Sequence, residues 1–346
     1  MRLAIRTEAI VQSLFAIVVG LVAGALLMIF FGYNPVQAYL ALFSGAFGGI
    51  SEFMETLAYA VPLMLTGLAF AIGVRAGLFN IGAEGQMYLG ALAAAVVGGS
   101  LNLPFGLSLI LATLAASFAG ALWGLSPALL KISRGVHEVI STIMFNWIAF
   151  WFTIYMVVYH FADPNRAEKS ITVLESNRYT VLFQGSTLTT AIFVAVAMCL
   201  ISYALLWGTR MGYELRVMGA NPDAAHYGGI KSWQTTLIAF TLGGISSGLA
   251  GASQVMGRPS AWSLYATLGN VAGLGFNGMA VALVGRNHPL GVIMASIFFG
   301  ALEQGSRNMQ YQAGVYFEVV KAINGIIIIA LSVPEAVTVV RRLMKK

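Results

Sequence analysis

The chain has 346 residues, of which 58% are hydrophobic and only 9% are charged. A soluble domain carries about 25% charged residues, so this composition excludes an ordinary soluble protein and indicates a membrane protein. The formal net charge of +6 would suggest nucleic-acid binding in a soluble chain. In a membrane protein, Lys and Arg instead mark the cytosolic side, and we expect no nucleic-acid partner.

Cysteine and histidine give no sign of a disulfide or of a metal site. Cys199 is alone in an apolar run, so no intramolecular disulfide is possible. The histidines at 137, 160, 226 and 288 lack the spacing of metal ligands. We therefore expect no metal and no cofactor on this chain.

Apolar segments occur along the whole chain. A helix needs about 20 apolar residues to cross the hydrocarbon of a bilayer. The segments that meet this length approximately are 10–32, 55–74, 82–99, 107–126, 138–160, 187–207, 235–255, 269–285, 289–305 and 317–334. The first follows Arg2 and Arg6 without a small-residue cleavage pattern, so we expect a retained span rather than a signal peptide. Residues 34–54 suit either an interfacial helix or a re-entrant segment.

The distribution of Lys and Arg predicts the orientation. With the N-terminus inside, the outer side holds only Arg166, Lys169, Arg178, Arg258 and Arg307. The cytosolic side collects Arg2, Arg6, Arg75, Lys131, Arg134, Arg210, Arg216, Lys231, Arg286, Arg341, Arg342, Lys345 and Lys346. This asymmetry is the one that the positive-inside rule expects, and it predicts that both termini are cytosolic.

Ten spans divide into five and five, within a single transmembrane domain over 1–346. Because five is odd, a second half that repeated the first would be inverted in the membrane, as in many transporters. The expected halves are about 1–160 and 187–340. A weak sequence similarity between LFNIGAEGQ at 78–86 and GFNGMAVAL at 275–283 supports a repeat. We therefore expect an all-α membrane protein with two inverted halves.

The polar stretch 208–234 interrupts the apolar sequence and contains a short capped helix. Asn221 suits the N-cap, and Pro222 suits the first helical position. Asp223 complements the helix dipole in the first turn, and Gly228 or Gly229 can end the helix in a left-handed cap. Such a helix outside the membrane offers a partner a surface to push on, although an ordinary loop with a helical turn fits the spacing too.

A second polar interruption, RAGLFNIGAEGQMYLG at 75–90, places Asn80, Glu84 and Gln86 among glycines. A charged side chain inside the membrane is costly, so Glu84 must lie at the water interface, or face protein or a wet cavity. The stretch is either a gate or cavity wall made from an interrupted helix, or a cytosolic turn between the second and third spans.

Two further sites combine an aromatic side chain with an amide. Asn146 lies between Phe145 and Trp147, and Phe276 precedes Asn277. Each pair offers a hydrogen bond beside a stacking surface, although an intramembrane Asn commonly ties helices together.

Two glycine patterns resemble catalytic motifs but favour helix packing. Residues 273–278 match G-x-G-x-x-G, but no βαβ unit surrounds them. Residues 244–248 match G-x-S-x-G, but no histidine maps near that serine, and small residues recur there every three or four positions. The chain also lacks G-x-x-x-x-G-K-[ST], so ATP hydrolysis would belong to another polypeptide. The outer loop 161–186 is either a docking surface for a delivering protein or a plain solvated connection.

Four stretches together carry a family resemblance: FNIGAEGQMYLGA at 79–91, GVHEVISTIMFNWIA at 135–149, GYELRVMGANPDAAHYGGI at 212–230 and GLGFNGMAVALVGRNHPLG at 273–291. They resemble permease subunits of bacterial ATP-binding-cassette importers for simple sugars, branched-chain amino acids and nucleosides. The match runs from about 55 to 330. The FNIGAEGQ and HEVISTIM forms are most similar to the nucleoside branch.

The resemblance implies a ten-span, multi-pass permease in the bacterial inner membrane, which is not itself an enzyme. Its implied partners are ATPase subunits that carry ATP and Mg²⁺, a second permease (a copy or a paralogue), and an extracytoplasmic binding protein or lipoprotein. The helix that couples the family's permeases to their ATPase maps here onto Asn221, Pro222, Asp223, Ala224, Ala225, His226 and Tyr227.

We therefore expect a permease for nucleosides, because stacking surfaces and neutral hydrogen bonds suit a base and a ribose. The candidate pathway residues are Phe79, Asn80, Glu84, Gln86, Asn146, Trp147, Phe276 and Asn277. Ribose or another simple sugar is the alternative cargo. An ion-coupled secondary transporter is the alternative class, and it would need an unpaired membrane carboxylate such as Glu84, Glu55 or Glu303.

Overall fold

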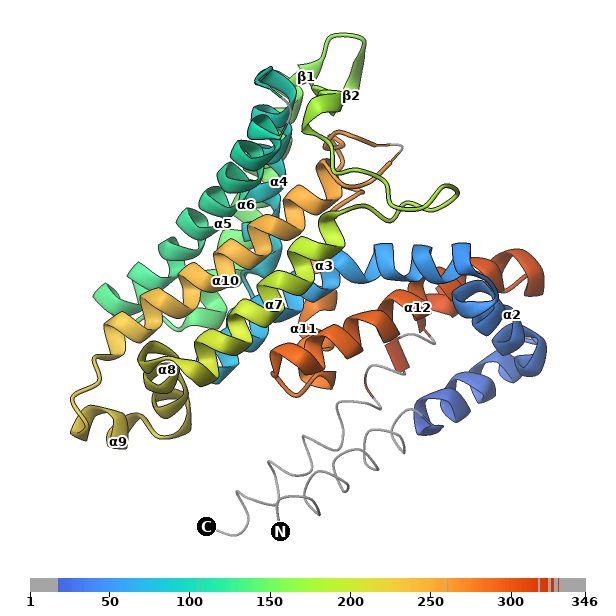
Figure 1. Ribbon diagram of the computed structural model, residues 1–346. Coiled ribbons are helices and arrows are strands. Elements are labelled where there is room, and N and C mark those ends of the chain that lie inside the picture. Colours follow the sequence, from blue (N-terminus) through green and yellow to red (C-terminus); the bar gives the residue numbers. More distant parts are fainter. Residues whose placement is uncertain are drawn as a thin grey trace. The chain divides into compact units, whose positions relative to one another are not determined.

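The structure is a computed structural model that describes residues 18–104, 106–259, 261–316, 318–322, 325–326 and 329. These residues are mostly helical (Figure 1). Of the predicted first span, 10–32, only the part from residue 18 is described. Most of the predicted last span, 317–334, lies outside the described residues.

A helix over Val18–Phe30 precedes the labelled elements. These are α2 (Pro35–Phe47), α3 (Ile50–Arg75), α4 (Ala83–Ser100), α5 (Leu107–Arg134), α6 (Glu138–Tyr159), β1 (Ala162–Asp163), β2 (Arg166–Ser170), η1 (Glu175–Asn177), α7 (Ala191–Gly208), α8 (Arg210–Ala220), α9 (Pro222–Tyr227), α10 (Ser232–Val255), α11 (Leu274–Val284) and α12 (Pro289–Ala313).

Among the described residues, five helices are long and apolar enough to cross a membrane: α3, α5, α6, α7 and α10. Each coincides with a predicted span, and α4 lies where the span 82–99 is predicted. The prediction of an all-α membrane protein is therefore confirmed in its coarse form. Several apolar helices in one chain make it a multi-pass membrane protein.

The predicted span 269–285 is wrong in length. The helix found there, α11, has only 11 residues, which is about 16 Å at 1.5 Å per residue against about 30 Å of hydrocarbon. Residues 269–273 form turns instead. The Asn270 side chain donates to the Ser263 carbonyl at 2.9 Å and accepts from the Tyr265 N–H at 3.3 Å. These bonds keep residues 269–273 in a non-helical conformation, and the helix begins only after Gly273.

The chain forms two compact units, one over 57–299 and the other over 1–56 with 300–346. Within the first, α4, α5 and α10 pack on one another, and α6 and α7 lie beside them (Figure 1). The apolar windows of α3 and α10 are 89% and 72% buried, whereas those of α5, α6 and α7 are each 28% buried. We infer that α3 and α10 form the centre and that α5, α6 and α7 turn apolar side chains outward, as lipid-facing helices do.

Small residues bring the helices of this unit into close contact. A Cβ at Gly248 of α10 would overlap the Ala116 carbonyl of α5, and a Cβ at Gly90 of α4 would overlap the backbone of Gly248. The Ser246 hydroxyl donates to the Leu65 carbonyl of α3 at 2.6 Å. Close backbone approach is how membrane helices gain packing energy. The packing interpretation of the G-x-S-x-G pattern is confirmed.

The segment 161–186 is attached to the segment that follows α10. Its β1–β2 hairpin is antiparallel. The Ser170 N–H donates to the Leu264 carbonyl and the Val173 N–H to the Trp262 carbonyl, both at 2.8 Å. In the hairpin, the Asn165 N–H donates to the Asp163 carboxylate and holds the pKa of that carboxyl below its usual value. This loop is therefore an ordered part of the unit.

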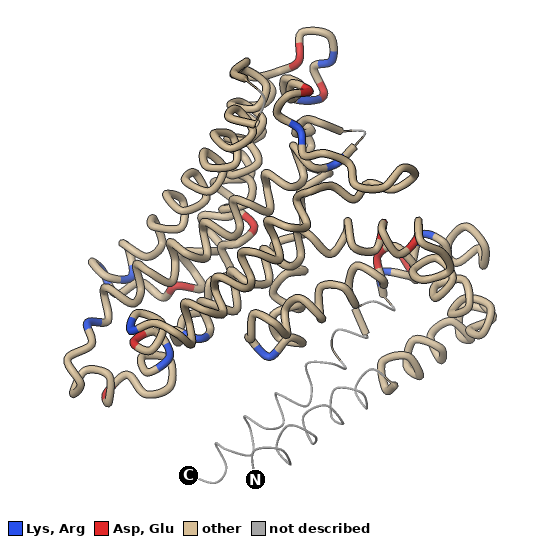
Figure 2. The backbone as a smooth tube through the Cα atoms, in the orientation of Figure 1, with Lys and Arg blue, Asp and Glu red and all other residues tan. Residues whose placement is uncertain are grey.

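In residues 57–299 the charged residues gather at the two ends of the helices, around α8 and α9 at one end and around the hairpin at the other (Figure 2). Few lie between these ends. This distribution is the one expected of a body whose middle lies in hydrocarbon.

In the other unit, residues 34–54 form α2 and the start of α3, separated at Gly48–Gly49. The Tyr39 hydroxyl donates to the Leu21 carbonyl at 2.6 Å, and the Asn308 side chain donates to the Ala41 carbonyl at 2.7 Å. These bonds tie α2 to the Val18–Phe30 helix and to the end of α12.

We predict that Gly248→Ala lowers the stability of the protein by about 1–3 kcal/mol, because the added methyl group overlaps the backbone of α5. The matched control is Gly208→Ala at the end of α7, where a Cβ meets nothing within 4 Å. Thermal midpoints of both variants, measured by size-exclusion chromatography in detergent, check this. Equal midpoints would contradict the packing described above.

Candidate functional site at the junction of α3 and α4

The α3–α4 junction, residues 76–82, is where one helix ends and the next begins. Its first residues alternate between buried (Ala76, Leu78, Asn80) and exposed (Gly77, Phe79). Gly77 has φ +75°, a left-handed conformation that favours glycine. A Cβ at Gly219, near the end of α8, would overlap the Gly77 N and the Arg75 carbonyl. The backbone of α8 therefore lies directly against the start of the junction.

Two amide side chains accept hydrogen bonds from backbone N–H groups at the start of α4. The Asn80 Oδ1 accepts from the Gly82 N–H at 3.0 Å. Asn146, buried on α6, accepts from the Gly85 N–H at 2.9 Å and donates to the Ile81 carbonyl at 2.9 Å. The first N–H groups of a helix have no partner within it, so Asn146 supplies one from a neighbouring helix. Both polar groups of Asn146 are in use, as in a side chain that ties helices together.

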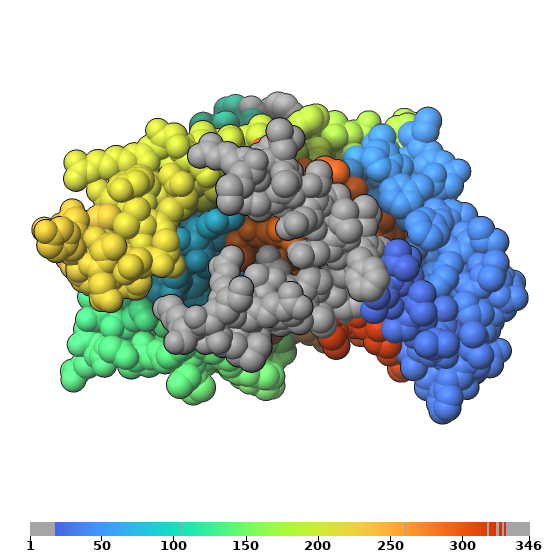
Figure 3. Space-filling view, turned by 90° about the horizontal axis from the view of Figure 1, so that it is seen from below, coloured from blue at the N-terminus to red at the C-terminus, as the bar shows by residue number. Residues whose placement is uncertain are grey.

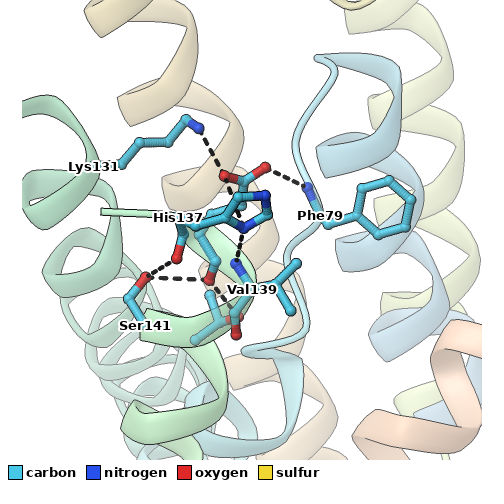
Figure 4. Close-up of polar contacts among 7 residues, drawn as sticks. Phe79, Lys131, His137, Val139 and Ser141 are labelled. Carbon is cyan, nitrogen blue, oxygen red and sulfur yellow. Dashed lines mark hydrogen bonds and ion pairs between the residues drawn. The ribbon is translucent and has the colours of Figure 1, made fainter. Parts of the chain in front are cut away.

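Glu138 binds the middle of the junction at Phe79, and Figure 4 shows Lys131, His137 and Phe79 around this contact. It begins α6 and is 5% exposed. Its carboxylate accepts from the Lys131 ammonium at 2.7 Å and from the Phe79 N–H at 3.4 Å. The His137 Nδ1 lies 3.8 Å from the same carboxylate and accepts from the Val139 N–H at 3.3 Å. One buried carboxylate thus joins α5, α6 and the junction.

Glu84, in the first turn of α4, reaches the start of α11. Its Oε1 accepts from the Tyr88 hydroxyl at 2.6 Å and from the Gly273 N–H. Its Oε2 accepts from the Gly275 N–H at 2.6 Å and the Phe276 N–H at 3.2 Å. A carboxylate at a helix N-terminus complements the helix dipole. Glu84 is 2% exposed and faces protein, which is one of the placements that the sequence leaves open.

The candidate pathway residues fall into two groups. Asn80, Glu84, Gln86 and Asn146 are buried, and the Gln86 Nε2 donates to the Asn80 Oδ1 at 3.3 Å. The exposed members are Phe79, Trp147, Phe276 and Asn277.

Two of the exposed aromatic side chains belong to the segments that Glu84 joins, Phe79 to the junction and Phe276 to the first turn of α11. Phe79 is 50% exposed and Phe276 is 45% exposed, and Phe79 also meets Phe70 edge-on at 5.8 Å. Figure 3 shows the yellow residues of α8 and α9 on one face, with the blue of the segment near residue 80 and the orange of the segment near α11 visible beside them. Trp147, by contrast, lies on α6 and is 60% exposed.

The capped helix predicted at 221–227 is confirmed as α9. The Asn221 Oδ1 accepts from the Ala224 N–H at 3.1 Å, and Pro222 is the first helical residue. Gly229 rather than Gly228 takes the left-handed conformation, with φ +78°. Only Ala225 of this helix is buried, and Tyr227 is 98% exposed. The helix presents almost its whole surface outward.

Sequence reasoning missed Arg75, Lys131 and Glu138 as parts of this site. The signal for the pair was present, since Lys131 and Glu138 are opposite charges on either side of a turn at Gly135. The described residues contain no group of three His, Cys, Asp or Glu side chains arranged for a metal ion.

The comparison with known families decides where the chain belongs. The family model described as "Branched-chain amino acid transport system / permease component" matches residues 52–332. The chain belongs to this permease family. The match includes the junction, α9 and the start of α11, so the site described above lies within the residues that the family model matches.

Named relatives cover the permease almost from end to end. It is 38% identical to the guanosine ABC transporter permease protein NupP of Bacillus subtilis, over 99% of this chain and 98% of that one. It is 33% identical to the nucleoside ABC transporter permease protein NupB of Lactococcus lactis, over 95% and 92%. A glucose ABC transporter permease protein of Haloferax volcanii is 30% identical, over 92% and 86%.

We predict that Asn146→Ala destabilises the permease by about 2–4 kcal/mol, because it leaves a buried N–H and a buried carbonyl at the start of α4 without partners. Asn102→Ala is the control, since that amide is exposed in a loop. Chemical or thermal unfolding in detergent measures the difference. An Asn146→Ala protein as stable as the control would show that the two bonds contribute little.

Proposed function

We propose that the permease is the membrane subunit of an ATP-driven importer for nucleosides. The observation that carries the proposal is the end-to-end similarity to two relatives named for guanosine and for nucleosides, at 38% and 33% identity. A glucose permease is similar at 30%, so a simple sugar is the alternative cargo, with weaker support.

The site chemistry supports a neutral cargo. The N-terminus of α11 is the natural place for an anionic group to bind, but the Glu84 carboxylate accepts hydrogen bonds from three backbone N–H groups there. Phe79, in the junction, and Phe276, in the first turn of α11, offer exposed aromatic faces. Stacking on aromatic rings and neutral hydrogen bonds suit a nucleobase and a ribose.

We further propose ten spans in two inverted halves, about 1–160 and 187–340, with both termini in the cytosol of a bacterium. The eighth of these spans consists of the turns at 269–273 followed by the short helix α11 rather than one full-length helix. The helices of the described residues and the gathering of charges at their two ends support this arrangement. On this orientation α8 and α9 face the cytosol, and the β1–β2 hairpin faces the compartment from which a binding protein delivers cargo.

The proposed driving force is ATP hydrolysis on a partner subunit, which binds ATP and Mg²⁺ and pushes on α9. The near-complete exposure of α9 supports this role. A second permease, a copy or a paralogue, completes the pathway. The rival class, an ion-coupled transporter, needs a free intramembrane carboxylate. Glu84 accepts four hydrogen bonds and is therefore a poor candidate.

The direct test is uptake of radiolabelled guanosine by vesicles that contain the permease with its partner subunits. We expect uptake that needs ATP and that unlabelled nucleosides suppress more strongly than free pentoses or glucose. Uptake driven by a proton gradient with ATP withheld would refute the ATP-driven class. Competition by glucose alone would refute the nucleoside assignment.

We predict that Tyr227→Ala abolishes binding of the ATPase subunit, because the variant removes the most exposed side chain of α9. Co-purification of the ATPase with the tagged permease measures this. Tyr311→Ala is the control, since Tyr311 is 90% exposed on α12, away from α9 in sequence. Normal co-purification of the Tyr227→Ala protein would argue against α9 as the contact.

We predict that Phe276→Ala changes the ranking of nucleosides in uptake competition, because it removes a stacking surface at the start of α11. The control is Phe193→Ala on α7, where Phe193 is 64% exposed. A base–aromatic stack is worth about 1–3 kcal/mol, so the inhibition constants of purine nucleosides should rise about 5- to 150-fold. Identical competition profiles would remove Phe276 from the pathway.

A further inference from the structure

The short helix α11 is held at both of its ends by side chains that flank one junction. At its N-terminus, Glu84 accepts from the backbone N–H groups of Gly273, Gly275 and Phe276. Beyond its C-terminus, Arg75 donates from Nε to the Asn287 carbonyl at 2.7 Å and from Nη2 to the Arg286 carbonyl at 3.0 Å. The negative side chain lies at the positive end of the helix dipole, and the positive one lies at the negative end.

Arg75 and Glu84 lie on either side of residues 76–82. Arg75 is the last residue of α3, and Glu84 is the second residue of α4. Between these two attachments, α11 also rests on α3, because Gly278 is in close contact with Thr66, whose hydroxyl donates to the Leu274 carbonyl at 3.0 Å. A displacement of the junction must therefore carry α11 with it or break these bonds.

The same junction is in contact with α8. A Cβ at Gly219 would overlap the backbone of Arg75 and Gly77. Near the end of α7, the Trp207 ring faces two guanidinium groups, that of Arg75 at 5.5 Å and that of Arg216 on α8 at 5.6 Å. The Arg216 Nε also donates to the Leu206 carbonyl at 2.9 Å. Only Asn221 separates α8 from α9.

We propose that Arg75 and Glu84 are positioning residues that make α11 follow the α3–α4 junction. A push on α9 moves α8, Gly219 transmits that movement to the junction, and the two charged side chains carry it to both ends of α11. The first turn of α11 exposes Phe276 and Asn277, so the movement changes the wall of the transport pathway. Arg75 and Glu84 do this without touching the cargo. The inference rests on the proposed function.

The test places a nitroxide on the first turn of α11 through Asn277→Cys, and separately on α8 through Tyr213→Cys, which is 57% exposed. Both use a Cys199→Ser background, since Cys199 is the single native cysteine. The complex of permease and ATPase is measured by electron paramagnetic resonance with and without ATP and Mg²⁺. In the parent protein we expect ATP to change the spectra of both labels.

In Glu84→Gln and in Arg75→Met we expect ATP to change the α8 spectrum only. The glutamine has the size of the glutamate but puts an NH₂ group against the backbone N–H groups of α11, and methionine removes the donors to the Arg286 and Asn287 carbonyls. Arg75→Lys keeps a charged donor and should restore the α11 response. Glu175→Gln, at a glutamate whose side chain is 91% exposed in the outer loop, should leave both responses intact.

Failure of the inference and failure of the proposed function give different results. An α11 label that still responds to ATP in Glu84→Gln and Arg75→Met would overturn the inference. An α8 label that is silent in the parent protein would overturn the ATP-driven function instead. Without nucleotide, both variants should raise the mobility of the α11 label, and unchanged mobility in both would also overturn the inference.

Discussion

The contact between the Glu84 carboxylate and the start of α11 solves two physical problems at once. A buried carboxylate is costly unless hydrogen-bond donors surround it, and the first N–H groups of a buried helix are costly unless an acceptor meets them. Glu84 receives three backbone N–H groups and the Tyr88 hydroxyl. Each group compensates the burial of the other, so the polar interruption after α3 and the short helix α11 depend on one another.

This contact also explains why the glycine-rich pattern at 273–278 is not a nucleotide site. The pattern does open a helix whose N-terminus binds an anion, but the anion is a side chain of the same chain. Interrupted helices of transporters often point such an N-terminus at an anionic cargo. Here that position is filled, which leaves aromatic faces and neutral amides as the exposed chemistry nearby and agrees with a nucleoside as cargo.

The sequence predicts local features of this protein well and distant contacts poorly. The caps of α9 follow from Asn221 and Pro222, and the close packing of α10 follows from glycines at helical spacing, because both depend on neighbouring residues. The sequence also indicates that Glu84 needs partners. The sequence does not show which residues these partners are, because Glu84 and Gly273 are 189 positions apart. They come together only through the packing of α4 against α11. The length of α11 was missed because 269–285 is a mostly apolar run with the length of a span. The hydrogen bonds of Asn270 that keep residues 269–273 out of the helix depend on contacts that the sequence does not show.

The most direct measurement is a pair of cryo-electron microscopy structures of the assembled transporter in lipid, one without nucleotide and one with ATP bound. The account predicts that α9 is buried against the ATP-binding subunit in both, and that Glu84 remains within hydrogen-bond distance of the Gly275 N–H while α11 and the α3–α4 junction move together. An α9 that contacts no ATP-binding subunit, or an α11 that moves away from Glu84 between the two states, would contradict it.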